Sequence, residues 1–206
     1  MSLTVAKFQA RTKVLGPGIR AVVWFHGCTR HCPHCIAAGM NHSEDFETIA
    51  AEQLAERVLQ LDDIEGITLS GGEPFQQNAV DLLAFVQAVK AKSNLSIMVY
   101  TGYLIDELKS RPETAKILQF LDLLVDAPYI HEQNDDSVWR GSANQTIHFL
   151  SERYMALREE ILHRKGREME IRLGLDGTLD LTGIPSKKFV ENLDKALNAK
   201  QMSITW

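Results

Sequence analysis

The sequence predicts an α/β protein in which strands and helices alternate around a parallel sheet that curves toward a partial or full barrel. A continuous apolar run, typical of a buried strand, occupies residues 21–25, and further strands are expected at 66–69, 96–100 and 123–126. Stretches with apolar residues at helical spacing lie between these strands, at about 48–61, 79–89 and 104–121. Because 45% of the 206 residues are hydrophobic, the chain can fill the core that such a fold requires.

The first buried strand follows a weaker element and leads directly into a cysteine loop. Residues 5–14 mix apolar and basic side chains and are expected to form an edge strand before the turn at Gly16-Pro17-Gly18. The strand at 21–25 then opens into the loop that holds every cysteine of the chain. In the helix that comes next, one face is formed by Ala51, Leu54, Ala55, Val58 and Leu61.

The pattern changes in the second half of the chain. The helical stretch at 104–121 is expected to break around Pro112. Residues 151–165 are typical of a charged helix, and Asp176-Gly177 predicts a two-residue hairpin turn between two short strands. A short helix is expected after Pro185. We therefore predict a core domain over residues 1–150 and a C-terminal helix and β-hairpin extension over 151–206, packed on the core.

Composition excludes several classes of function. A formal net charge of -5 gives no electrostatic footprint for nucleic acid. No apolar stretch approaches the length of a membrane span, and the N-terminus lacks the pattern of a signal peptide. Three cysteines clustered on one loop argue against a secreted disulfide framework. We expect a cytoplasmic protein that has neither a nucleic acid nor a membrane as its partner.

The cysteine loop indicates a metal centre. Cys28, Cys32 and Cys35 follow a C-x3-C-x2-C spacing, and the sequence has no fourth cysteine. Soft thiolates on a tight loop suit an iron–sulfur cluster or zinc. Because three thiolates leave one iron of a four-iron cluster without a protein ligand, such a cluster could bind a substrate or cofactor directly.

Two simpler interpretations of the cysteines remain open. A Cys3His zinc site, which would make the protein a noncatalytic metal-binding module, could recruit His26, His31 or His34. The cysteines could also be unrelated core residues. Zinc sites of the structural kind usually join two separated pairs of ligands, and the sequence shows no second pair.

A glycine-rich segment follows the strand at 66–69. Gly71 and Gly72 would let the backbone come close to a ligand, and Glu73 offers a carboxylate to a ligand ammonium group. The alternative is a strand-end turn in which Glu73 is solvated. The residues from Cys28 to Cys35, the glycine segment, Thr101 and Asp126 all come directly after expected strands, which places them on the C-terminal edge of the sheet.

The cysteine spacing together with Ser70-Gly71-Gly72-Glu73-Pro74 resembles the radical S-adenosylmethionine superfamily over roughly residues 20–150. The resemblance implies a 4Fe-4S cluster held by the three cysteines, with the methionine amine and carboxylate of S-adenosyl-L-methionine on the open iron. It also implies a partial TIM-like (β/α) barrel. His34 occupies a position that is often aromatic in this superfamily and could stack on the adenine.

The resemblance gives weaker expectations for two other residues. Thr101 and Asp126 could touch the ribose or carboxylate of the cofactor, or a cation beside it. Asp126 could equally cap a turn before Pro128.

A narrower resemblance links the chain to the anaerobic ribonucleoside-triphosphate reductase activating proteins, a group of glycyl-radical enzyme activases. It rests on Tyr100-Thr101-Gly102-Tyr103, Val125-Asp126-Ala127-Pro128-Tyr129 and Trp139-Arg140-Gly141-Ser142-Ala143-Asn144-Gln145. Arg140 is a planar cation suited to gripping a carboxylate or a partner backbone. The alternative is a polar surface turn in which Ser142 or Asn144 caps the next element. The chain departs from these activases at Ile36-Ala37, where they commonly have Tyr-Asn.

Together the resemblances imply a radical S-adenosylmethionine oxidoreductase. The enzyme would cleave the cofactor to methionine and a 5'-deoxyadenosyl radical, with electrons from a donor such as flavodoxin or ferredoxin. The radical would then take a hydrogen atom from a glycine of a large glycyl-radical enzyme. A small-molecule enzyme similar to 7-carboxy-7-deazaguanine synthase is the alternative within the same chemistry.

Overall fold

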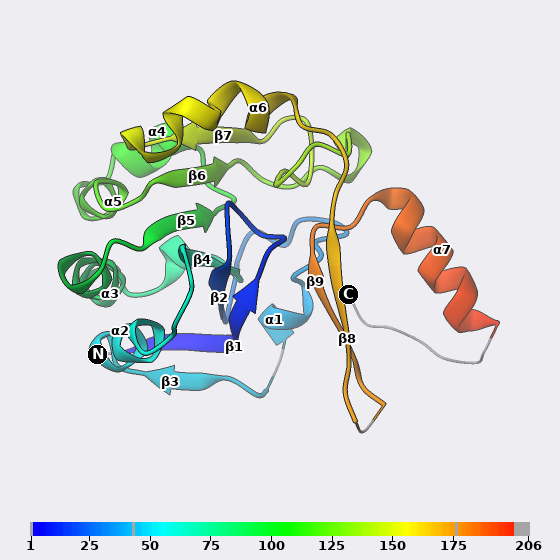
Figure 1. Ribbon diagram of the computed structural model, residues 1–206, viewed down its shortest axis with the longest axis horizontal. Helices are drawn as coiled ribbons and strands as arrows, with labels where there is room; N and C mark the ends of the chain where they lie inside the picture. Colours follow the sequence, from blue (N-terminus) through cyan, green and yellow to red (C-terminus); the bar gives the residue numbers. More distant parts are fainter. Residues whose placement is uncertain (1, 43, 176, 200–206) are drawn as a thin grey trace.

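The computed structural model describes residues 2–42, 44–175 and 177–199. Its centre is a seven-stranded sheet in the order β3-β1-β2-β4-β5-β6-β7 (Figure 1). The strands span Leu3–Thr12 (β1), Arg20–Phe25 (β2), Glu47–Ile49 (β3), Gly66–Gly71 (β4), Ser96–Tyr100 (β5), Leu123–Asp126 (β6) and Thr146–Phe149 (β7). Strands β2, β4, β5 and β6 are parallel, while β1, β3 and β7 pair antiparallel to their neighbours. The predicted α/β class with a mostly parallel sheet is confirmed.

The two faces of the sheet are covered differently, because successive side chains of a strand point to opposite faces. On one face, Val23, Leu69 and Val99 pack against the helices α2 (Ala51–Leu59), α3 (Ala79–Lys92), α4 (Ile105–Lys109) and α5 (Pro112–Leu118). On the other, Trp24 and Met98 contact residues from the loops and from the C-terminal part of the chain. Burial on both faces explains why the parallel strands are continuous apolar runs.

The expectation of a full barrel is wrong for the described residues, whose strands form an open sheet with β3 and β7 at its two ends. The alternation of parallel strand and helix stops at β6, since β7 returns antiparallel to it. At the other end, β1 is not an edge strand as predicted, because β3 pairs outside it through Leu3 and Ile49. Strands β3 and β7 are short, and neither is predicted from the sequence.

Several helical segments begin or end as their sequences require. The break expected around Pro112 separates α4 from α5, which starts at that proline. The charged helix expected over 151–165 is a 3-10 helix, Glu152–Leu157 (η3), followed by α6, Arg158–His163. The remaining short elements are α1 (Gly39–His42), η1 (Pro74–Gln76) and η2 (His131–Gln133).

The C-terminal segment forms the predicted hairpin and helix, which lie apart from helices α2 to α5 (Figure 1). Strands β8 (Met169–Leu173) and β9 (Leu179–Gly183) pair Leu173 with Leu179, so their connection is longer than the expected two residues. Asp176 of the predicted turn lies outside the described residues. Helix α7 (Lys187–Asn198) begins at Ser186, whose side chain accepts a hydrogen bond from the Phe189 amide. Each helix in the described part of the chain is too short or too polar to cross a bilayer.

Candidate active site

A cavity of about 470 Å³ opens at the C-terminal ends of the parallel strands. It is lined by most of the residues that the sequence singles out, namely Cys28, Cys32, His34, Cys35, Ser70, Gly71, Gly72, Glu73 and Thr101. These residues follow β2, β4 and β5, and the carboxyl ends of parallel strands meet at one edge of a sheet. The fold therefore brings together segments that are far apart in the chain.

The cysteine loop presents three free, half-buried thiols to this cavity. The loop turns back on itself through left-handed backbone conformations at His31 (φ 47°) and His34 (φ 58°). The Cys35 amide donates a hydrogen bond to the Cys32 carbonyl, at 3.2 Å. Burial raises the pKa of the Cys28 and Cys35 thiols. Among the described residues, no three Cys, His, Asp or Glu side chains converge on a point where one metal ion could sit.

Gly71, the last residue of β4, and Gly72 allow this segment to touch the start of the cysteine loop. A Cβ atom at Gly72 would lie 2.1 Å from the Gly27 carbonyl oxygen, and Gly71 has a φ of 94°. The Glu73 amide donates to the same Gly27 oxygen at 2.8 Å. Only glycine permits so close an approach of two backbones. The glycines are therefore needed for contact between two parts of the chain, in addition to any contact with a ligand.

Glu73 is buried rather than solvated, with 1% of its surface exposed. Its Oε1 accepts hydrogen bonds from the Thr101 hydroxyl at 2.8 Å and from the Phe75 amide at 3.0 Å. Its Oε2 accepts one from the Gly102 amide at 2.8 Å. Burial raises the pKa of Glu73, and these hydrogen bonds oppose that effect. Since each carboxylate oxygen has two lone pairs, Oε2 retains capacity for one further donor from the cavity.

Aromatic rings form another part of the cavity wall. The rings of His34 and His131 lie 4.4 Å apart, and the Tyr129 hydroxyl is 3.1 Å from Nδ1 of His131. Tyr100, at the end of β5, also lines the cavity. Its hydroxyl is buried and has no hydrogen-bond partner within the described part of the chain. Burial raises the pKa of Tyr100, so its hydroxyl keeps its proton and remains a donor.

Asp126 and Arg140 are not among the residues that line the cavity. Asp126 is buried, and its carboxylate accepts hydrogen bonds from the Ile105 amide at 2.9 Å and the Thr146 amide at 3.3 Å. Nε2 of His148 lies 2.9 Å from the same carboxylate. These contacts fix the starts of α4 and β7. Asp126 thus has a capping role, although on segments other than the turn before Pro128.

Arg140 ties its own loop together. Its guanidinium donates to Asp135 at 3.1 Å, to the Ser137 hydroxyl at 2.9 Å and to the Gln145 carbonyl at 3.1 Å. Gly141 and Gln145, from the same segment, do line the cavity. This loop therefore contributes to the cavity wall through Gly141 and Gln145, and Arg140 holds the loop in shape.

Other residues that line the cavity were not identified from the sequence. Arg30 lies between two of the cysteines, stacks 4.2 Å from the Tyr103 ring centre and pairs with Glu107 at 3.3 Å. Its place in the cysteine loop is a signal that could have identified it. The C-terminal wall residues Leu181, Thr182, Gly183, Ile184, Pro185, Lys187 and Val190 carry no comparable motif.

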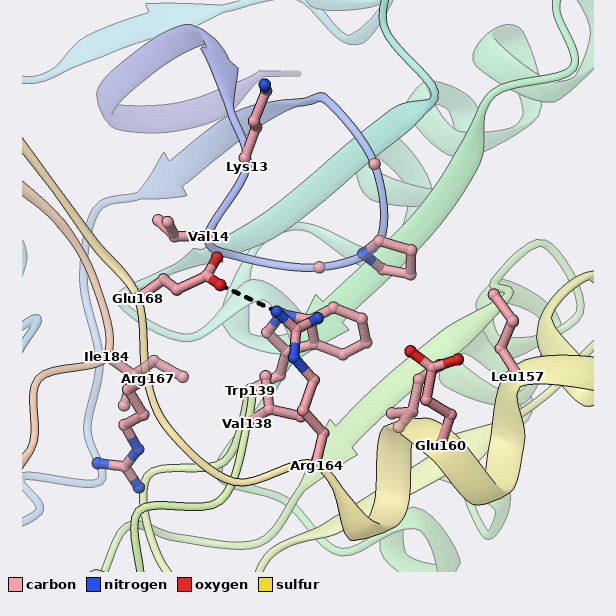
Figure 2. Close-up of a pocket in the computed structure, with 14 residues that line it drawn as sticks. Lys13, Val14, Val138, Trp139, Leu157, Glu160, Arg164, Arg167, Glu168 and Ile184 are labelled. Carbon is pink, nitrogen blue, oxygen red and sulfur yellow. Dashed lines mark hydrogen bonds and ion pairs between the residues drawn. The ribbon is translucent and has the colours of Figure 1, made fainter.

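A second cavity, of about 220 Å³, lies between the β1–β2 connection and α6 (Figure 2). The ion pair between Arg164 and Glu168 reaches across it near Trp139. None of the candidate site residues lines this cavity, although Ile184 lines both cavities. The first cavity is therefore the candidate site.

Known proteins share the part of the chain that carries this site. The family described as a 4Fe-4S single cluster domain matches residues 14–148. The anaerobic ribonucleoside-triphosphate reductase-activating protein of Escherichia coli (strain K12) is 34% identical over 147 residues, which cover 66% of this chain and 92% of that protein. The protein of the same name from Haemophilus influenzae is 38% identical over 143 residues, covering 65% and 89%. The one from Enterobacteria phage T4 is 29% identical over 138 residues, covering 65% and 86%.

These matches agree with the residues gathered in the cavity, since the three cysteines, the glycine segment and Thr101 all fall within the matched range. Residues 149–206 lie beyond the family match. The chain belongs to the 4Fe-4S single cluster domain family, in which the relatives named here are anaerobic ribonucleoside-triphosphate reductase-activating proteins.

Proposed function

We propose that this protein is a radical S-adenosylmethionine enzyme that activates an anaerobic ribonucleotide reductase, and that its open sheet serves as the partial barrel of that superfamily. The observation that carries the proposal is one cavity shared by Cys28, Cys32, Cys35 and the segment Gly71–Glu73. When bound, a 4Fe-4S cluster and S-adenosyl-L-methionine would supply one-electron cleavage of the cofactor's C5'–S bond, yielding methionine and a 5'-deoxyadenosyl radical that takes a hydrogen atom from a substrate carbon.

The donor set fits a cluster better than a single ion. Three thiols face the cavity from one loop, and they do not converge on one point as the ligands of zinc would. A cluster distributes its thiolate ligands over separate irons, so it does not need such convergence. Because the thiols of Cys28 and Cys35 have raised pKa values, loading the site must release their protons.

The other cavity residues would bind and orient the cofactor. Oε2 of Glu73 has a lone pair for the methionine ammonium group, and the Thr101 and Gly102 hydrogen bonds hold that carboxylate in place. The neighbouring rings of His34 and His131 offer flat surfaces for the adenine. Trp24 and Ala127 are apolar parts of the lining that would exclude water from the reacting atoms.

The proposed substrate is a glycine of a large glycyl-radical reductase, and the proposed electron donor is a small one-electron carrier such as flavodoxin or ferredoxin. The names of the relatives support the reductase as the partner. Such chemistry belongs in the reducing, cytoplasmic compartment expected from the cysteine content. No relative named here favours a small-molecule substrate such as that of a deazapurine synthase.

The deciding experiment is 5'-deoxyadenosine formation by anaerobically reconstituted protein supplied with dithionite and S-adenosyl-L-methionine. We expect wild type to form it and the Cys28→Ala, Cys32→Ala and Cys35→Ala variants to lose both the product and the bound iron and sulfide. His31→Ala is the control, because His31 lies in the loop but does not line the cavity. Addition of the reductase should then produce a glycyl radical detectable by electron paramagnetic resonance. A colourless protein with one zinc per chain and no sulfide would overturn the proposal.

A further inference from the structure

Part of the wall of the candidate cavity comes from the C-terminal segment 181–190. Leu181, Ile184, Lys187 and Val190 line the same cavity as the three cysteines. All four lie beyond residue 148, where the family match ends. This chain therefore adds to the shared site a surface that the matched range does not supply.

Contacts with the core hold this wall in place. The Thr182 hydroxyl donates to Oε1 of Gln9 on β1 at 2.8 Å, and both side chains are buried. Lys7 of β1 forms an ion pair with Asp180 of β9. Arg167 donates both to the Pro185 carbonyl, at 2.8 Å, and to the Ser137 carbonyl of the core, at 3.1 Å. Since these contacts hold the segment against β1 and against the loop of Ser137, it is part of the fold rather than a loose tail.

The cavity-lining residues of this wall are mostly apolar, and they include the ammonium group of Lys187. Lys187 forms no hydrogen bond or ion pair within the described part of the chain. The other cations of the lining are already paired, Lys7 with Asp180 and Arg30 with Glu107. An unpaired cation at a cavity attracts an anionic group.

From these contacts we infer that Lys187 binds an anionic group of the hydrogen-donating substrate, while Ile184 and Val190 contact the apolar part of that substrate. This inference rests on the proposed function, because it takes the cavity as the place where the substrate meets the cofactor. The anionic group is the carboxylate of an acidic side chain near the target glycine of the reductase. A phosphate on a small molecule would carry a similar charge, and the experiment separates the two.

Charge reversal at Lys187 tests the inference, with a matched control on the next residue. Lys188 is the next residue of the same helix, but it is exposed and does not line the cavity. We would measure the affinity of Lys187→Glu, Lys188→Glu and wild type for the purified reductase, and separately for inorganic phosphate by tryptophan fluorescence. Trp24 lines the cavity and can report binding there. These binding measurements need no cofactor turnover.

We expect Lys187→Glu to weaken the affinity for the reductase by about tenfold, and Lys188→Glu to leave it unchanged. Loss of phosphate binding alone would identify a small anionic substrate and overturn the inference. Equal losses in both variants, or no loss in either, would overturn the inference.

Cofactor cleavage without the reductase separates this inference from the proposed function. Lys187→Glu should keep the wild-type KM for S-adenosyl-L-methionine. A raised KM would show that Lys187 holds the cofactor's own carboxylate instead, and the inference would then be wrong. Absence of cleavage in wild type would refute the proposed function, while the binding comparison would still decide whether Lys187 recognises an anion.

Discussion

The Glu73 carboxylate and the Thr101 hydroxyl lie 2.8 Å apart, and their hydrogen bond joins the segments that follow β4 and β5 in the lining of the cavity. The same carboxylate holds the amides of Phe75 and Gly102. Glu73 is thus both a support for two strand ends and a candidate ligand-binding group.

Replacing Glu73 with Ala should separate these two roles. Loss of the carboxylate leaves buried donors without a partner, which should lower the free energy of unfolding by about 3 kcal/mol. We expect the cluster to remain, because no cysteine changes, and the affinity for S-adenosyl-L-methionine to fall by about tenfold or more. Urea unfolding, iron content and equilibrium binding measure the three effects. Glu113→Ala, at an exposed carboxylate that does not line the cavity, is the control. Unchanged cofactor affinity would remove the ligand-binding role of Glu73.

A Gly72→Ala substitution should disturb the cysteine loop through the backbone. The new Cβ would meet the Gly27 carbonyl at 2.1 Å, and neither backbone can move without shifting a strand end. We expect a loss of about 2–4 kcal/mol in stability, together with incomplete cluster loading. Gly166→Ala provides the comparison, since its φ is 91° but no atom lies within 4 Å of the added Cβ. It should cost about 1 kcal/mol and load normally.

Removing the Tyr100 hydroxyl should affect the empty and the loaded protein in opposite directions. The buried hydroxyl has no partner within the described residues, so Tyr100→Phe should leave the stability of the empty protein unchanged or raise it by about 1 kcal/mol. If the hydroxyl donates to a bound cofactor, the variant should bind S-adenosyl-L-methionine several-fold more weakly. Thermal unfolding with and without the cofactor tests both statements. A clear destabilisation of the empty protein would show that the hydroxyl already has a partner.

Asp122 should make stability depend on pH in the acid range. Burial tends to raise its pKa, but hydrogen bonds from Lys90 at 2.6 Å, Ser151 at 2.6 Å and the Ile97 amide at 2.8 Å together hold that pKa below its usual 3.8. The ionised form therefore stabilises the fold above pH 3.8, and this contribution is lost as the pH falls through the lowered value.

We accordingly expect Asp122→Asn to cost about 1–3 kcal/mol near pH 7 and progressively less below about pH 4. Urea unfolding at several pH values measures the difference. Asp106→Asn is the control, because the Asp106 side chain is 89% exposed and its ion pair with Lys109, at 3.6 Å, lies at the surface. A cost for Asp122→Asn that does not change with pH would contradict the assigned role of the carboxylate.

The central parallel strands were predictable because they are buried on both faces and appear as uninterrupted apolar runs such as Ala21–Phe25. The short strands β3 and β7 were not, since their positions depend on pairing with distant partners, as in Val125 with Ile147. An alternation of apolar and polar residues over only three or four positions is too short to indicate such pairing. The open form of the sheet was not predicted for the same reason, because β3 and β7 are the strands at its two ends.

The candidate site was predictable where its residues follow strands directly, as Cys28 and Thr101 do. Asp126 is the last residue of β6, but its carboxylate accepts hydrogen bonds from the amides of Ile105 and Thr146, and no local pattern in the sequence reveals those partners. The wall that includes Lys187 depends on where a hairpin packs, which is set by contacts such as Thr182 with Gln9. Such contacts join opposite ends of the chain and leave no motif.

The order of these segments along the chain also has a consequence for how the protein matures. During synthesis the cysteine loop emerges from the ribosome before Ile184 and Val190, which line the same cavity. Until segment 181–190 has been made, the cavity that holds the thiols lacks this part of its lining. The candidate cluster site therefore takes its final shape only after the hairpin and the start of α7 have packed on the core.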